Sequence, residues 1–225
     1  MIMTLDNLGI GYSHTLVSGI SQRLTPGQFV CLTGRNGTGK STLLRTLCGL
    51  LPPLQGSVSI GGQQLHTLPS SLLARKIGLV LTQAPELHNT TLRELVAYGR
   101  LPYTTWTGRL SAEDLDAADE AIRTLGIEHL AHRPLLQLSD GERQKGMIAR
   151  ALAQGTEYML LDEPSAFLDH ESKQELMQLL VHLAHDGHKA ILLSTHDLEL
   201  AERYADLLWH ISDGHLSAIR PTGHI

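Results

Sequence analysis

The chain has 225 residues and a formal net charge of −5; 42% of the residues are hydrophobic and 18% are charged. This composition is that of a folded globule with one domain or two closely joined subdomains. The mild acidity argues against a broad nucleic-acid surface, which needs clustered Lys and Arg. No apolar run is long enough to span a membrane. Residues 1–7 lack both the basic and the apolar region of a signal peptide, so we expect a cytoplasmic protein.

Short strands are expected at the beginning of the chain. Residues 1–10 and 57–60 have strand patterns, and Gly9-Ile10-Gly11-Tyr12 is predicted to form a turn that ends in an exposed aromatic ring. The apolar run 29–32 predicts a further strand. Cys31 on that strand and Cys48 downstream are expected to be small core residues, because a disulfide does not suit a reducing compartment.

A phosphate-binding pattern follows the strand 29–32. The residues are Gly34-Arg35-Asn36-Gly37-Thr38-Gly39-Lys40-Ser41-Thr42, which match G-x-x-x-x-G-K-[ST]. Apolar residues at 43, 44, 47 and 50 then have the spacing of a buried helix face. The glycines allow N–H groups to turn toward an anion, and the helix start adds unpaired donors and the positive end of its dipole. Lys40 would supply a charge to the terminal phosphates, and the Ser41 hydroxyl would bind Mg²⁺. The alternative, a glycine-rich turn without a ligand, does not explain the Lys-Ser pair.

The middle of the chain changes from strands to helices. A hairpin is predicted over 56–65 around Gly61-Gly62, and a strand over 77–81 that ends at Thr82-Gln83. From residue 84 to residue 154 the apolar spacing is helical. Ser111-x-x-Asp114 is a capping pattern at the start of one helix, and the last helix, over 140–154, is closed by Gly155.

Strands return after this helical insert. The uninterrupted apolar run 158–161 predicts a central strand, which ends in Asp162-Glu163. A helix with Leu176, Leu179, Leu180 and Leu183 on one stripe follows, then a strand over 190–193 that ends at Ser194-Thr195-His196. One or two edge strands are expected in 206–225. This alternation predicts an α/β fold with a mainly parallel sheet and a site at the carboxyl ends of its strands.

The polar residues at those strand ends suit phosphoryl transfer. Asp162 can hold Mg²⁺ directly or through a water, and Glu163 can polarise the attacking water. Gln83 would orient a metal-bound water, and His196 would donate to the γ-phosphate. Two solvated acids at a strand end are the alternative, which the neighbouring phosphate cradle makes weak.

A family resemblance covers the whole chain. Leu138-Ser139-Asp140-Gly141-Glu142 resembles the L-S-G-G-Q signature of the nucleotide-binding subunits of ATP-binding cassette (ABC) transporters, and it stands ahead of the strand 158–161 as in that family. The resemblance implies a single ABC ATPase domain over 1–225 with a P-loop NTPase core, an N-terminal antiparallel β subdomain and an inserted helical subdomain. The RecA-like core and the β subdomain would occupy 1–83 and 155–225, and the helical signature subdomain 84–154.

The resemblance also implies roles for individual residues. Gln83 would be the Q-loop residue, 166–169 the D-loop and His196 the switch histidine. Ser139 and Gly141 of one subunit would close over ATP held by the cradle of a second copy in a head-to-tail dimer. Tyr12 would stack on adenine, although a rim tyrosine without a ligand fits the sequence equally well.

Two residues depart from the family signature. Asp140 replaces a glycine and Glu142 a glutamine, which brings negative charge near a triphosphate. We expect the Asp140 side chain to turn away, so that Ser139, Gly141 and the first-turn amides make the contacts.

Within the family, two segments look most like importers of iron siderophores, haem or cobalamin. They are Tyr98-Gly99-Arg100-Leu101-Pro102-Tyr103, followed by Asp114, and Leu138 to Gln154 with its Ser-Asp-Gly-Glu-Arg-Gln start. The resemblance implies an integral membrane permease as partner, indirectly a substrate-binding protein, and a place on the inner face of the membrane through the permease. No nucleic acid partner is expected. Tyr98, Tyr103 and Trp106 would either contact a permease helix or pack within the insert.

Two other functions are weighed against an importer ATPase. A soluble ABC ATPase of DNA repair or translation would usually carry a coiled coil, a zinc hook or a second cassette. The chain has no heptad array, no Cys-x-x-Cys and no second cradle. A regulatory or scaffold module that binds ATP without turnover would not need Glu163 and His196.

Overall fold

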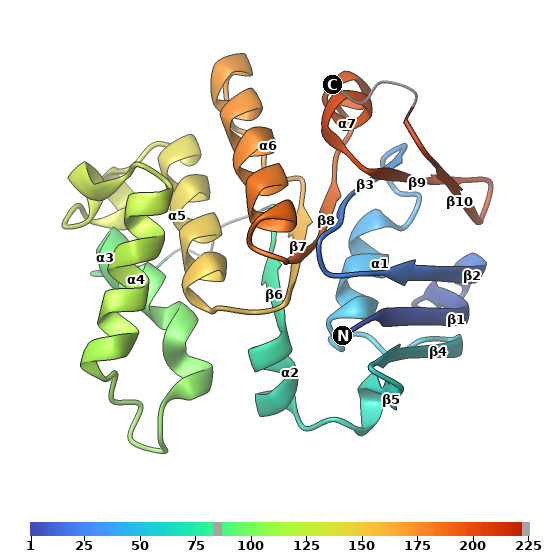
Figure 1. Ribbon diagram of the computed structural model, residues 1–225, viewed down its shortest axis with the longest axis horizontal. Helices are drawn as coiled ribbons and strands as arrows, with labels where there is room; N and C mark the ends of the chain where they lie inside the picture. Colours follow the sequence, from blue (N-terminus) through green and yellow to red (C-terminus); the bar gives the residue numbers. More distant parts are fainter. Residues whose placement is uncertain (83–86, 222–225) are drawn as a thin grey trace.

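The computed structural model describes residues 1–82 and 87–221. Two sheets and a lobe of helices make up the molecule (Figure 1). The antiparallel sheet has the order β2-β1-β4-β5 and the larger sheet the order β10-β9-β3-β8-β7-β6, in which β10 alone runs antiparallel to its neighbour. The strands are β1 (Met3–Gly11), β2 (Thr15–Leu24), β3 (Phe29–Gly34), β4 (Gln55–Ile60), β5 (Gln63–Gln64), β6 (Ile77–Val80), β7 (Tyr158–Asp162), β8 (Ala190–Ser194), β9 (Leu207–Ser212) and β10 (His215–Ile219). The predicted α/β fold with a mainly parallel sheet is confirmed.

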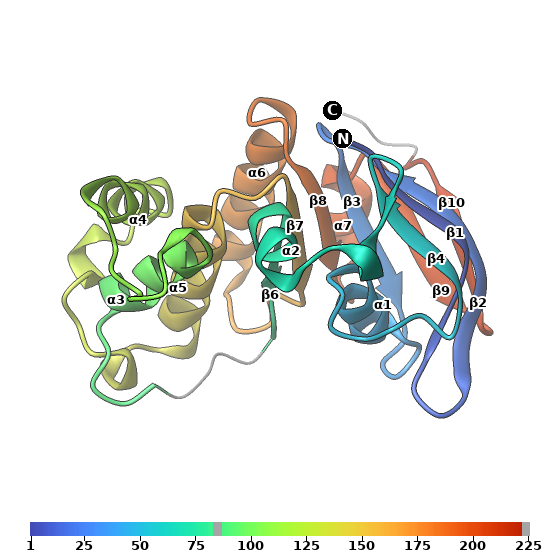
Figure 2. The same ribbon diagram turned by 90° about the horizontal axis from the view of Figure 1, so that it is seen from below.

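Some of the helices form a separate lobe, and others lie beside the sheets. Figure 2 shows α3, α4 and α5 together in one lobe, while α1 lies beside the antiparallel sheet. The α-helices are α1 (Lys40–Leu47), α2 (Ser70–Lys76), α3 (Leu92–Ala97), α4 (Ala112–Thr124), α5 (Asp140–Ala153), α6 (His170–His185) and α7 (Leu198–Tyr204). Short 3₁₀ turns are η1 (Leu65–Thr67), η2 (Tyr98–Tyr103), η3 (Glu128–Leu130) and η4 (Leu135–Gln137). Among the residues that the structure describes, no helix has both the length and the apolar character needed to cross a bilayer.

The parallel strands separate two hydrophobic cores. Along β3, Phe29 and Cys31 pack in the core shared with α5, α6 and α7, whereas Val30 and Leu32 pack with α1 and the antiparallel sheet. This period of two follows from the alternation of side chains in a strand. Because both faces are covered, the central strands have no polar alternation, as the sequence predicted. Burial also raises the pKa of the Cys31 thiol, which makes it an inert core residue.

The first helix is shorter than predicted. Its apolar spacing extends to Leu50, but α1 ends at Leu47, and Leu50 is 65% exposed. Gly49 has φ 79°, its N–H donates to Thr46 O, and the N–H of Leu50 donates to Arg45 O. A glycine in the left-handed conformation therefore ends the helix before Leu50.

Two further sequence expectations need correction. The turn predicted at 9–12 lies later, because β1 continues through Gly11, which pairs with Thr15. A side chain at Gly11 would come within 2.0 Å of His14 O, so the glycine permits the close return of the chain. The buried stripe of α6 is also rotated from the predicted leucines: Leu176, Met177, Leu180 and Ala184 are buried.

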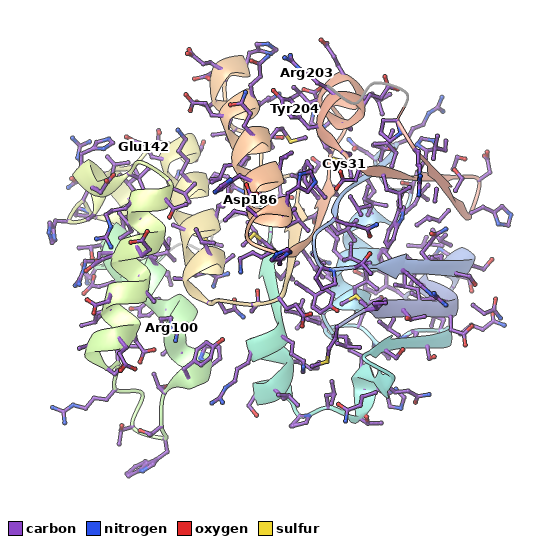
Figure 3. The ribbon with its side chains drawn as sticks, viewed as in Figure 1. Cys31, Arg100, Glu142, Asp186, Arg203 and Tyr204 are labelled. Atoms are coloured by element: carbon purple, nitrogen blue, oxygen red, sulfur yellow. The ribbon has the colours of Figure 1, made fainter. Side chains whose placement is uncertain are left out.

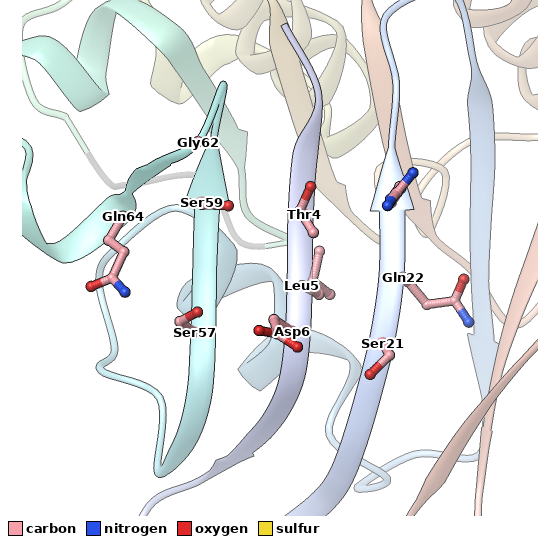
Figure 4. A pocket seen from close by; sticks show the side chains of 10 residues that line it. Thr4, Leu5, Asp6, Ser21, Gln22, Ser57, Ser59, Gly62 and Gln64 are labelled. Carbon is pink, nitrogen blue, oxygen red and sulfur yellow. The ribbon is translucent and has the colours of Figure 1, made fainter.

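The open face of the antiparallel sheet is polar. Thr4 and Asp6 of β1 lie next to Ser57 and Ser59 of β4 (Figure 4), and together with neighbouring residues they line a hollow of about 750 Å³. The residues that line this hollow include none of the predicted site residues. The polar character is that of a sheet face in contact with water.

A joint connects the helical lobe to the sheet beside β6. The side chain of Gln154 donates to Ile77 O at 3.2 Å, and Tyr103 donates through its hydroxyl to Gln154 O at 2.9 Å. Arg75 of α2 donates to Pro102 O at 2.9 Å. Arg100, labelled in Figure 3, lies with its guanidinium 3.9 Å from the centre of the Tyr103 ring. Tyr103 therefore packs within the insert, one of the two alternatives for that residue.

Candidate nucleotide-binding site

The loop between β3 and α1 has the backbone that an anion cradle needs. Gly34, Gly37 and Gly39 all have positive φ, at 148°, 82° and 110°. A Cβ at Gly34 would lie 2.7 Å from Ile211 O, so this end of the loop packs closely against β9. A Cβ at Gly37 would meet nothing within 4 Å. Gly39 precedes α1 without a capping side chain, which leaves the first-turn N–H groups for an anion.

Lys40 is the first residue of α1, and its side chain reaches back to the start of this loop. It is 5% exposed, and its Nζ donates to Gly34 O at 2.9 Å and to Arg35 O at 3.3 Å. The same ammonium lies 3.6 Å from Glu163 Oε1. A buried ammonium needs partners, and here it has two carbonyl oxygens and one carboxylate. The charge is thus held at the place where the cradle would receive a terminal phosphate.

Asp162 is the last residue of β7 and is 5% exposed. Its Oδ1 accepts a hydrogen bond from Ser194 Oγ at 2.7 Å, and its backbone oxygen accepts one from Thr82 Oγ1 at 2.9 Å. The engaged Oδ1 leaves Oδ2 as the oxygen that can bind another group. The carboxylate is therefore oriented by its neighbour on β8.

Glu163 has an unusual backbone conformation. Its φ is 49°, in the left-handed region that costs a non-glycine residue about 1–3 kcal/mol. The N–H of Glu163 donates to Ser194 O at 3.1 Å. Its carboxylate lies near two cationic or ionisable groups: Lys40 Nζ, and His196 Nδ1 at 3.7 Å. The turn after β7 therefore places the second acid beside the cradle.

His196 and the cradle face one hollow of about 770 Å³. The imidazole is 61% exposed, so it is free to change its contacts when a ligand enters. The lining includes Gly34, Arg35, Asn36, Thr38 and His196. Three strand ends, those of β3, β7 and β8, thus bring Lys40, Glu163 and His196 together.

The remaining predicted residues lie farther from this cluster or outside the described part of the chain. Tyr12 is 55% exposed, and its hydroxyl accepts a hydrogen bond from Arg45 Nη1 of α1 at 3.1 Å. This leaves the ring open to a planar ligand. Gln83 is not among the described residues.

The signature segment begins α5. Ser139 Oγ accepts the N–H of Glu142 at 3.2 Å, and Glu142 Oε2 accepts the N–H of Ser139 at 2.8 Å, a reciprocal capping box. The N–H of Ser139 lowers the pKa of the Glu142 carboxyl. Asp140 pairs with Arg143 of its own helix. Both departures from the signature therefore have partners within α5.

The start of α5 is not close to the cradle of the same chain. Figures 1 and 2 place α5 in the helical lobe, on the far side of β6 and β7 from α1. A Cβ at Gly141 would lie 3.3 Å from Phe167 O, so α5 begins beside the segment 166–169 instead. One chain alone thus separates Ser139 and Gly141 from Lys40.

The residues present fit a nucleoside triphosphate and Mg²⁺. The open side of Gly37, the uncapped start of α1 and the buried Lys40 ammonium supply donors and positive charge to phosphate oxygens. Hydroxyl and carboxylate oxygens, which Ser41 and Asp162 carry, are the ligands that Mg²⁺ prefers. Ser41 lies in the first turn of α1, and Asp162 keeps one carboxylate oxygen for a ligand.

Neither Ser194 nor Thr82 was singled out in the sequence, although both contact Asp162. A signal was present, because Thr82 directly follows the predicted strand 77–81 and Ser194 directly follows the predicted strand 190–193. Using it would have required the strand order, which local patterns do not contain.

Comparison with known proteins decides the family. The family model "ABC transporter" matches residues 17–166. The chain belongs to the ABC transporter family. The achromobactin transport ATP-binding protein of Dickeya dadantii is 40% identical over 207 residues, 91% of this chain and 76% of that relative. The iron(3+)-hydroxamate import ATP-binding protein of Bacillus subtilis is 36% identical over 214 residues, 94% of this chain and 79% of that relative.

A solved ABC cassette has the same fold. It is the dimeric structure of a post-hydrolysis state bound to ADP and Pi, with a TM-score of 0.85 and 28% identity, covering 99% of this chain and all of that one. The resemblance to ABC ATP-binding subunits and the P-loop ATPase fold are therefore confirmed, as is the prediction of an ATP-hydrolysing enzyme. The roles of the individual ABC motif residues stay predictions.

Proposed function

We propose that this chain is the ATP-hydrolysing subunit of an ABC importer for an iron chelate, haem or a cobalamin-type compound. The observation that carries the catalytic part is the convergence of Lys40, Glu163 and His196 at three neighbouring strand ends. The relatives named for achromobactin transport and iron(3+)-hydroxamate import support an iron chelate as the cargo. A cobalamin import ATP-binding protein of Halobacterium salinarum, 37% identical over 215 residues, supports a cobalamin-type cargo. Haem rests on the sequence resemblance alone. The names of these relatives favour an importer subunit over a soluble ATPase of DNA repair or translation.

The contacts described above and the family resemblance support the following roles. The backbone of residues 34–42 and the Lys40 ammonium bind the phosphates, and Tyr12 stacks on the adenine. Ser41, Asp162 and Gln83 would hold Mg²⁺, which would neutralise charge on the phosphates. Glu163 orients and polarises the attacking water, and His196 donates to the γ-phosphate. When phosphate oxygens bind the Lys40 ammonium, its attraction to the Glu163 carboxylate weakens. The carboxylate can then accept a hydrogen bond from the attacking water.

A second copy of the chain would bring a signature helix to the cradle, since the two lie apart within one chain. Ser139 and Gly141 at the start of α5 would close over the nucleotide in the cradle of the partner, in a head-to-tail dimer. The dimeric cassette with ADP and Pi supports this arrangement. The capping box engages the N–H groups of Ser139 and Glu142, and it leaves those of Asp140 and Gly141 for phosphate oxygens. We further propose the division into a core and β subdomain, 1–83 and 155–225, and a helical signature subdomain, 84–154.

The membrane permease is the other proposed partner. Trp106 is 97% exposed and Tyr98 is 41% exposed, on the helical insert, so both rings are available to a partner helix. The names of the relatives, which state transport and import, support an association with a membrane permease. We further propose a place at the inner face of the membrane through that permease, and a substrate-binding protein as an indirect partner.

The experiment that tests the proposal uses Glu163→Gln. This substitution keeps the size of the side chain but removes the base, so it should abolish turnover and trap an ATP-bound dimer. We would capture it with ATP from detergent-solubilised membranes of its native host and identify what accompanies it. Recovery of a polytopic permease supports the importer. Recovery of ribosomal or DNA-repair proteins alone would contradict transport, and near-normal hydrolysis would eliminate Glu163 as the base.

A further inference from the structure

The hydroxyl of Ser194 lies between the two acids of the candidate site. In the parallel pair β7 and β8, Asp162 stands opposite Ser194, and Ser194 has no exposed surface. Ser194 Oγ donates to Asp162 Oδ1 at 2.7 Å and accepts from the N–H of Glu163 at 3.0 Å. The single proton of the hydroxyl is thus committed to the carboxylate, and a lone pair is committed to the next residue.

These two bonds constrain both acids. A carboxylate that accepts a short O–H bond in a buried place is fixed in rotation, so the direction of Asp162 Oδ2 is set by Ser194. Glu163 is held at φ 49°, with its N–H shared between Ser194 Oγ and Ser194 O. A non-glycine residue keeps this conformation only when its surroundings fix it. Both oxygens that accept a hydrogen bond from the Glu163 N–H belong to Ser194.

We propose that Ser194 is a positioning residue for ATP hydrolysis. Its hydroxyl directs Asp162 toward Mg²⁺ and keeps Glu163 in the conformation that brings its carboxylate to Lys40 and His196. The inference rests on the roles proposed above for Asp162 and Glu163. Alanine has no hydroxyl, and cysteine is a weak donor, whereas threonine retains both the donor and the acceptor.

A buried serine also has a simpler explanation, which is that it satisfies neighbouring polar groups and nothing more. In that case its loss would lower stability without changing how the protein responds to Mg²⁺. Thr156 offers a matched control, because it is 1% exposed and donates to Tyr158 O at 2.9 Å, at the opposite end of the β7 region. Thr156→Ala removes one buried hydroxyl and leaves the acids untouched.

The experiment compares the wild type with Ser194→Ala, Ser194→Thr and Thr156→Ala. We would measure ATP turnover against Mg²⁺ concentration, and the binding of a fluorescent ATP analogue in EDTA. For Ser194→Ala, kcat should fall at least tenfold and the Mg²⁺ concentration for half-maximal turnover should rise at least fivefold. Binding in EDTA should change less than twofold, because the hydrogen bonds of the Ser194 hydroxyl go to Asp162 and to the N–H of Glu163, and not to Lys40 or the cradle backbone. Ser194→Thr should recover kcat to within threefold of the wild type, and Thr156→Ala should match the wild type in all three measurements.

The inference is overturned if Ser194→Ala keeps kcat and its Mg²⁺ dependence within twofold of the wild type. It is also overturned if Ser194→Thr, folded, remains as inactive as Ser194→Ala. Should Ser194→Ala fail to fold, Ser194→Cys carries the same test, because it keeps an atom at the γ position and weakens the bond to Asp162. Wild-type turnover that Glu163→Gln abolishes, together with a normal Ser194→Ala, would refute this inference alone. Absence of wild-type turnover would refute the proposed function.

Discussion

Lys40 Nζ lies 3.6 Å from Glu163 Oε1, so the two charges proposed to act on the nucleotide compensate each other in the free protein. Lys40→Ala removes the phosphate-binding charge, and we expect the affinity for MgATP to fall at least tenfold. The measurement is equilibrium binding of a fluorescent ATP analogue. Lys76→Ala is the control, because it removes the same charge from the end of α2. An unchanged affinity in Lys40→Ala would refute the cradle assignment.

The charge of Asp140 is expected to have little effect on turnover. Asp140 pairs with Arg143 on its own helix, and exposed pairs of this kind contribute about 0–1 kcal/mol. Asp140→Gly should therefore leave the ATPase rate within a few-fold of the wild type. Asp140→Asn is the matched control, since it removes the charge without placing a glycine in the first turn of α5. A rise of more than tenfold in both variants would show that the carboxylate opposes closure of the dimer.

The hydroxyl of Tyr103 is expected to stabilise the joint between the helical lobe and the sheet. Tyr103→Phe removes its hydrogen bond to Gln154 O but keeps the ring against Arg100. Loss of one such bond costs about 1 kcal/mol, or a fall of about 2–4 °C in Tm for a chain of this size. Thermal unfolding measures the change. Tyr98→Phe, at a ring that is 41% exposed, should leave Tm unaltered. Equal effects in the two variants would contradict the role of the joint.

Local patterns predicted those parts of the site that closely follow an apolar strand in the sequence. The cradle, Asp162-Glu163 and His196 were located because each stands directly after an apolar strand, and parallel strands bring their carboxyl ends to one edge. The role of Ser194 escaped because it depends on the register of β8 against β7, across 32 residues of sequence. That register is set by packing on both sheet faces.

The misplaced helix end has a more local cause. The apolar spacing through Leu50 is genuine, but Gly49 takes the left-handed conformation and ends α1 first. A periodicity of leucines does not register such a stop, whereas the glycine does. The turn predicted at 9–12 overlaps β1, which continues through Gly11, and β2 begins at Thr15.

The helical lobe should lose stability in acid through Asp114. This carboxylate, 7% exposed, accepts the N–H of Ser111 at 3.0 Å and Arg100 Nε at 2.9 Å. The Ser111 N–H, with Arg100, lowers the pKa of Asp114. A lowered pKa in the folded state gives stability that is present above the unfolded value of about 3.9 and is lost as pH falls through the folded value. Asp114→Asn should therefore unfold at lower urea concentration than the wild type at pH 7, and the difference should shrink below about pH 4. Asp116→Asn, at an exposed position of the same helix, should track the wild type throughout. A difference between Asp114→Asn and the wild type that stays constant from pH 7 to pH 3 would show that the charge of Asp114 contributes nothing.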